Sequence, residues 1–69
     1  MSVYKVIRII GSSPSSWEDA TRSAVEEAAK HLQQLRVGEV EQLDVRLEDG
    51  KVVEYRSRVS VSFRYEVGK

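Results

Sequence analysis

The chain has 69 residues, and its eleven basic and eleven acidic side chains give a formal net charge of zero at pH 7. A neutral chain without an apolar run near the roughly 18 residues of a membrane span predicts neither a nucleic-acid partner nor a membrane-spanning segment. The absence of cysteine and the single histidine exclude disulfides, thiolate metal sites and histidine-cluster zinc sites, so a domain this small is expected to need self-association for stability.

The first predicted strand covers residues 3–10 (VYKVIRII), because this segment is β-branched and aromatic. Ile7 and Ile9 are expected on its core side. The strand begins without a signal-peptide pattern, and the lack of cysteine agrees with a cytoplasmic protein. A single domain over residues 1–69 is therefore expected.

The next segment, GSSPSS at residues 11–16, predicts a loop followed by a helix over residues 16–35. Ser15 and Glu18 have the spacing of a capping box, which satisfies free backbone N–H groups at a helix start. Apolar residues then recur at spacings of three and four: Trp17, Ala20, Ala24, Ala28, Leu32 and Leu35. Because alanine is small, this stripe is expected to lie close against a sheet.

The second and third predicted strands, residues 37–47 and 53–67, are joined by a turn around Asp49–Gly50. Asp-Gly favours a two-residue loop, which would pair residues of unlike faces. A three-residue loop, residues 49–51, pairs Leu47 with Val53, Val45 with Tyr55 and Leu43 with Ser57. It keeps the apolar faces together, so we expect the longer loop.

A change of parity inside the second strand predicts a β-bulge near Glu41. Leu43 faces the core, and in a regular strand Glu39 and Glu41, four and two residues earlier, would face the same way. The apolar residue in that part of the strand is Val40. One extra residue at the bulge would return Val40 to the core. The same shift would place Val37 on the outer face of the sheet, on the side of Arg56.

The last strand alternates over residues 53–67, with apolar side chains on one face and charges and serines on the other. A typical strand has about 5–6 residues, so this one overhangs any core that the chain can build. The excess is expected to pair with copies of the same chain.

The order is β-α-β-β, which predicts an α+β fold: a three-stranded antiparallel sheet of order 1-3-2 packed on one helix. One face of the sheet is covered by the helix. The other is charged, and it is bare in a monomer.

This order resembles the dodecin family of small proteins that assemble into hollow spheres of twelve. The resemblance covers essentially the whole chain and rests on the opening VYKVIRIIGSSPSSWEDA, the helix of about twenty residues, the Glu39–Val40 pair, the Asp49–Gly50 turn and the closing alternation. It implies a homododecamer that binds flavins such as FMN or riboflavin, or related compounds, between subunits near two-fold axes.

The resemblance also implies a ligand site at Val37, Asp44, Arg56 and Arg64. Val37 aligns with the tryptophan that stacks on the flavin ring, and Arg56 with the glutamine that reads its polar edge. Asp44 stands where many relatives have arginine, and Arg64 matches a basic position linked with phosphate groups. Valine offers no π face for stacking, so this chain is expected to lack the usual flavin-stacking tryptophan.

Two readings of the charged residues remain open. Arg56, Arg58 and Arg64 form either an anion site or subunit contacts. The acidic residues Glu39, Glu41, Asp44, Glu48 and Asp49 are either solvated or, at a symmetry axis, a Ca²⁺ or Mg²⁺ site.

The sequence offers no catalytic constellation. His31 is expected to be a partly exposed helix residue, the 11–16 loop lacks the ending of a phosphate loop, and no serine has a triad arrangement. We therefore expect a non-enzymatic, oligomeric small-molecule binding or storage protein. The alternative is a cation-binding or purely structural dodecamer.

Overall fold

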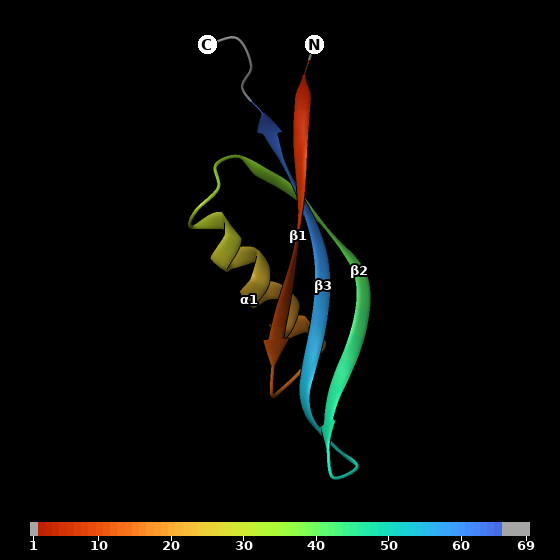
Figure 1. Ribbon diagram of the computed structural model, residues 1–69. Coiled ribbons are helices and arrows are strands. Elements are labelled where there is room, and N and C mark those ends of the chain that lie inside the picture. The colour runs from red at the N-terminus through yellow and green to blue at the C-terminus, as the bar shows by residue number, and fades with distance from the viewer. Residues whose placement is uncertain (1, 66–69) are drawn as a thin grey trace.

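The computed structural model describes residues 2–65 and confirms the predicted fold. The elements are β1 (Val3–Ser13), α1 (Trp17–Ala29), β2 (Leu35–Glu48) and β3 (Lys51–Tyr65). The three strands form one antiparallel sheet of order β1-β3-β2, with β3 in the centre (Figure 1). Val67, expected in the last strand, lies outside the described residues.

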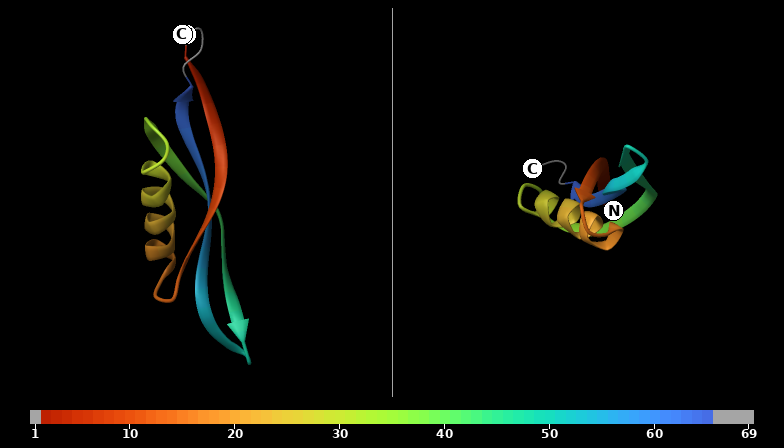
Figure 2. Two further views of the ribbon diagram at one scale, coloured as in Figure 1. Left: turned by 60° about the vertical axis from the view of Figure 1, so that its left-hand side comes forward. Right: turned by 90° about the horizontal axis from the view of Figure 1, so that it is seen from below.

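The helix covers only the middle of one face of the sheet, and the core lies between them (Figure 2). We call this the inner face, and the opposite face the outer face. The buried apolar residues of the described chain are Ala20 and Ala24 from the helix and Val59 and Val61 from β3. Ile7 pairs with Val61 and Ile9 with Val59, and both isoleucines are half-buried, which confirms their predicted facing.

A buried polar pair completes the inner layer. Ser57 is fully buried in the centre of β3, and its hydroxyl lies 2.7 Å from that of Thr21 on the helix. Thr21 Oγ1 is also 2.9 Å from the carbonyl oxygen of Trp17. A hydroxyl has one proton and accepts through its lone pairs, so all these contacts are satisfied if Ser57 donates to Thr21 and Thr21 to the carbonyl.

The helix is shorter than predicted and starts one residue later. Ser16, not Ser15, is the N-cap, and its hydroxyl accepts a hydrogen bond from the Asp19 N–H at 3.0 Å. The helix ends at Ala29 instead of residue 35. The apolar spacing continues to Leu35, but Leu35 is the first residue of β2 and lies opposite Phe63. Residues 30–34 must therefore return the chain from the helix to the sheet, and Gln34 adopts a positive φ of 59° there.

The bulge in β2 is confirmed. Val40 pairs with Val59 and Gln42 with Arg58, so Glu41 is the extra residue. Val37 is therefore on the outer face, opposite Ser62. The extra residue lets β2 keep apolar residues inward on both sides of this point.

The predicted three-residue loop is wrong, although two of its three predicted pairs are correct. Leu43 pairs with Ser57 and Val45 with Tyr55, but Leu47 pairs with Val52 rather than Val53. The turn is the two-residue Asp49–Gly50, with φ of 51° and 74°. A further irregularity, at residue 53 of β3, reconciles this tight turn with the apolar faces.

The molecule is long and thin, with extents of 53 × 19 × 14 Å. Its radius of gyration is 14.4 Å, against about 11 Å for a compact chain of this length. The hairpin tip extends beyond the helix at one end and the start of β1 at the other (Figure 2). Large apolar side chains are consequently exposed on these strands: Val3, Tyr4, Val6, Ile10, Val37, Val40, Leu43, Leu47, Val52 and Tyr65. No helix of the described chain has the length and apolarity to cross a bilayer.

Candidate functional site

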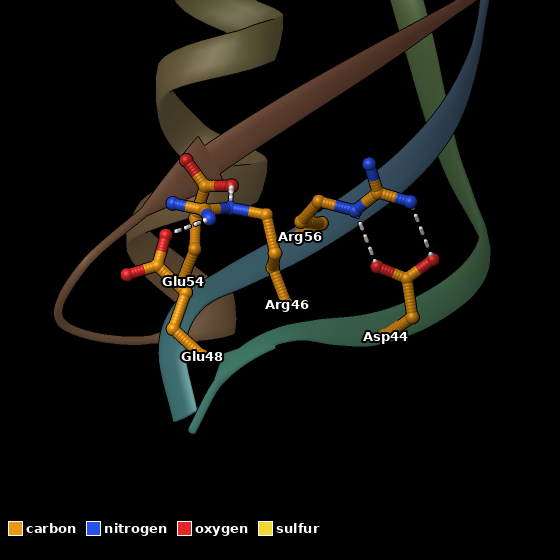
Figure 3. A network of polar contacts seen from close by, with 5 residues as sticks. All are labelled: Asp44, Arg46, Glu48, Glu54 and Arg56. Carbon is orange, nitrogen blue, oxygen red and sulfur yellow. Dashed lines mark hydrogen bonds and ion pairs between the residues drawn. The ribbon is translucent and has the colours of Figure 1, made fainter. Parts of the chain in front are cut away.

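The outer face carries a forked ion pair between β2 and β3. Asp44 and Arg56 are direct cross-strand partners. Arg56 Nε donates to Asp44 Oδ1 at 2.7 Å, and Arg56 Nη2 donates to Oδ2 at 3.1 Å (Figure 3). The pKa of Asp44 is lowered, chiefly by these hydrogen bonds, while burial works in the opposite direction. Asp44 is thus held as a carboxylate with both oxygens engaged.

The helix start holds the backbone on both sides of this pair. Trp17 Nε1 donates to the carbonyl oxygen of Asp44 at 3.0 Å. The Trp17 ring also packs edge-on against Tyr55, the residue before Arg56, with ring centroids 5.0 Å apart. Trp17 therefore lies partly exposed over the ion pair's strands rather than in the core.

Towards the hairpin tip, a second network joins Arg46 to two carboxylates. Its Nε donates to Glu54 at 3.1 Å and its Nη1 to Glu48 at 2.8 Å (Figure 3). The hydrogen bond from Arg46 is the largest cause of the lowered pKa of Glu54. Arg46 bonds one oxygen of each carboxylate, in contrast to the fork at Asp44.

The bulge residue Glu41 forms the third polar cluster. One of its oxygens accepts from Arg8 Nε at 3.0 Å, and the other accepts from the Ser60 hydroxyl at 2.6 Å. The Ser60 hydrogen bond is the main reason why the pKa of Glu41 is lowered. An open hollow of about 690 Å³ lies beside this cluster, lined by Arg8, Ile9, Ile10, Glu41 and Arg58. The bulge is what brings Glu41 to this position, and its role could not be read from charge pattern alone.

The four expected ligand residues lie in two groups on one chain. Asp44 and Arg56 are in contact, whereas Val37 pairs with Ser62, six positions along β3 from Arg56. Six residues of strand span about 20 Å. Arg64 is two positions beyond Ser62, on the same face as Val37. A small ligand that touches both groups must therefore lie between different subunits.

The acidic stretch of β2 is not gathered into a site within the described chain. No three His, Cys, Asp or Glu residues of the part described come close enough together to hold a metal ion. Glu41, Asp44 and Glu48 are each paired with an arginine. Glu39 and Asp49 form no ion pair within residues 2–65. His31 is exposed and lies 3.4 Å from Glu27 on the helix.

Comparisons with known proteins give one consistent result. A sequence profile of the family named Dodecin matches residues 3–66. Calcium dodecin from Mycobacterium tuberculosis is 44% identical over 64 residues, which cover 93% of this chain and 90% of that protein. A crystal structure of that calcium dodecin, described as calcium-chelating with a novel calcium-binding site, has a TM-score of 0.85 at 40% identity and covers 99% of this chain and 97% of its own. The dodecin from Streptomyces coelicolor has a TM-score of 0.90 at 33% identity, over 97% of this chain and 96% of its own.

Proposed function

Since this chain belongs to the dodecin family, as its sequence predicted, we propose that it is a homo-oligomeric protein that binds a divalent cation, with Ca²⁺ as the first candidate. Dodecins are non-enzymatic proteins that bind small ligands as homo-oligomers. The observation that carries the cation is the 44% identity to calcium dodecin, over nearly the full length of both proteins. Flavin, which the sequence favoured as the first reading, becomes the second candidate.

The geometry supports a cation held between subunits rather than within one. Carboxylate oxygens are the ligands that Ca²⁺ prefers, and it takes six to eight oxygens. The described part of one chain gathers no such set. In a closed symmetric assembly each carboxylate repeats around an axis, so one free residue can supply several ligands. Glu39, exposed on the outer face of β2 and without an ion pair in the described chain, is the residue best suited to this role.

Calorimetric titration of the assembled protein with CaCl₂ tests the proposal. We expect saturable heat and a rise in the thermal midpoint, because a ligand that binds only the folded state stabilises it, by about 2.7 kcal/mol at a hundred times its dissociation constant. Glu39→Gln should lose most of both effects, since it removes the charge and keeps the shape. Glu26→Gln, an exposed helix residue, is the matched control and should behave like the wild type. Absence of heat together with an unchanged midpoint in the wild type would reject cation binding.

A planar ligand such as FMN is the second candidate function, supported by the family and by the open outer position of Val37. Val37 is 62% exposed and stands on the face where the family resemblance puts the ring site. Arg56 and Arg64 lie on the same face, where they suit phosphate or polar ring atoms. A ring of this kind would lie between subunits, shielded from solvent, without any bond chemistry.

Val37→Trp is expected to strengthen FMN binding by about two- to tenfold, because aromatic stacking adds about 0.5–1.5 kcal/mol beyond burial. Quenching of flavin fluorescence during titration measures the change. Val40→Trp is the matched control: it makes the same substitution three residues away, on the inner face, and should leave FMN affinity unchanged. Equal affinity of Val37→Trp and the wild type would show that residue 37 is not at a ring site.

A further inference from the structure

The fork between Arg56 and Asp44 occupies a carboxylate that a cation could otherwise use. Both oxygens of Asp44 are hydrogen-bonded to a single guanidinium, at 2.7 and 3.1 Å. The two side chains are 39% and 34% exposed, so the pair is partly shielded from water. The guanidinium therefore stands where a metal ion bound to both oxygens of Asp44 would have to stand.

We propose that Arg56 is a specificity-determining residue that keeps divalent cations away from Asp44, so that they bind only at unpaired carboxylates such as Glu39. This inference rests on the proposed cation-binding function. A cation held by both oxygens of Asp44 would have to break two charge-assisted hydrogen bonds and leave a positive guanidinium beside a doubly charged ion. Arg56 thus competes with the cation for Asp44 from within the same chain, so its competition does not depend on protein concentration.

The pair is held in place from two sides, which makes it an effective competitor. The Trp17 N–H bonds the carbonyl of Asp44, and the Trp17 ring packs on Tyr55, next to Arg56. Arg56 and Asp44 also face each other directly in the strand register. These contacts fix the backbone that carries Asp44 and the residue beside Arg56, so the two side chains start from directly opposed positions on neighbouring strands.

The other paired carboxylates of the outer face are engaged differently. Arg46 gives one hydrogen bond each to Glu48 and Glu54, leaving one oxygen of each without an Arg46 bond. Glu41 receives one bond from Arg8 and one from an uncharged serine. Among these carboxylates, Asp44 is the one with both oxygens bonded to the same arginine. Removal of Arg56 would therefore free both oxygens of Asp44 for a cation.

The test is calorimetric titration of assembled Arg56→Gln with CaCl₂. Glutamine keeps the polar outer face and removes the charge. We expect the dissociation constant for Ca²⁺ to fall by about tenfold or more, or additional sites to appear, because a repelling charge is lost and a carboxylate is freed. The double variant Arg56→Gln/Asp44→Asn should lose this gain. Arg22→Gln, which removes one positive charge from the exposed helix surface, is the matched control and should leave binding unchanged.

The outcomes separate this inference from the proposed function. Calcium binding by Arg56→Gln but not by the wild type would reject the proposed function and support the role of Arg56. Equal binding by both would overturn the role of Arg56 while the proposed function stands. A gain that persists in the double variant would also overturn it, since Asp44 would then not be the ligand. Light scattering checks assembly: failure of both Arg56→Gln and Arg56→Ala to assemble would show that the pair serves assembly and would overturn the inference too.

Discussion

Replacing Val61 by aspartate is expected to abolish folding. Val61 is 1% exposed, lies in the central strand β3, and pairs with Ile7 on one side and Gly38 on the other. An unpaired charge buried at such a position costs about 3–5 kcal/mol. A domain of this size rarely gains more than about 3–5 kcal/mol from its core. The substitution therefore removes most or all of the stability of the chain.

Circular dichroism and light scattering of Val61→Asp are expected to show neither the native spectrum nor the native mass. Val52→Asp is the matched control, since the same substitution at an exposed valine of the same strand should leave a folded chain. A Val61→Asp variant that is soluble, folded and assembled would show that β3 presents its other face to the helix.

The second large effect is expected for Gly11→Ala, because the helix crosses β1 in direct contact with this glycine. An ideal Cβ at position 11 would overlap the carbonyl oxygen of Ala20 and lie 2.7 Å from the Cβ of Ala24. The first of these is a backbone atom, so relief requires the whole helix to move outward. Overpacking of this kind costs about 1–3 kcal/mol and sometimes more. We expect Gly11→Ala to lower the free energy of unfolding by an amount at the upper end of this range.

Chemical denaturation of the assembled protein measures the loss at Gly11. Gly38→Ala is the control with the same substitution in another strand, where the three nearest atoms to the added methyl would all be side-chain atoms, the first of them 3.4 Å away on Val25. The Gly38→Ala variant should lose well under half as much free energy of unfolding as Gly11→Ala. If the two variants lose similar amounts of free energy of unfolding, the close contact with the helix is not the reason why glycine is required at position 11.

The fold could be predicted because the strongest signals are periodic. Alternation in β3 and the parity change at Glu41 determine which face each strand turns to the core, and the observed register agrees at Val40 and Val37. The errors occur where two local rules compete. At the hairpin, Asp49–Gly50 keeps its two-residue turn, and a further irregularity restores the facing. At the helix end, the apolar spacing continues although the chain must already turn back.

The site was less predictable, because ion pairing depends on which side chains face each other across strands. The roles of Val37, Asp44, Arg56 and Arg64 came from the family resemblance and stay predictions. The structure adds that Asp44 and Arg56 bind each other and that Val37 lies about 20 Å away, six strand residues along the sheet. The predicted register, with Val45 opposite Tyr55 and Leu43 opposite Ser57, already places Asp44 opposite Arg56, but register alone does not show that the two side chains form a fork.

The thin, outstretched shape of the protomer has a consequence for how the protein is handled. A chain with few buried side chains and long apolar strands exposed gains much of its cohesion from its neighbours, so folding and association become one equilibrium governed by mass action. Its melting temperature should then climb as the solution is made more concentrated. Single chains released by dilution would expose these apolar strands to water, so they would either reassociate or precipitate.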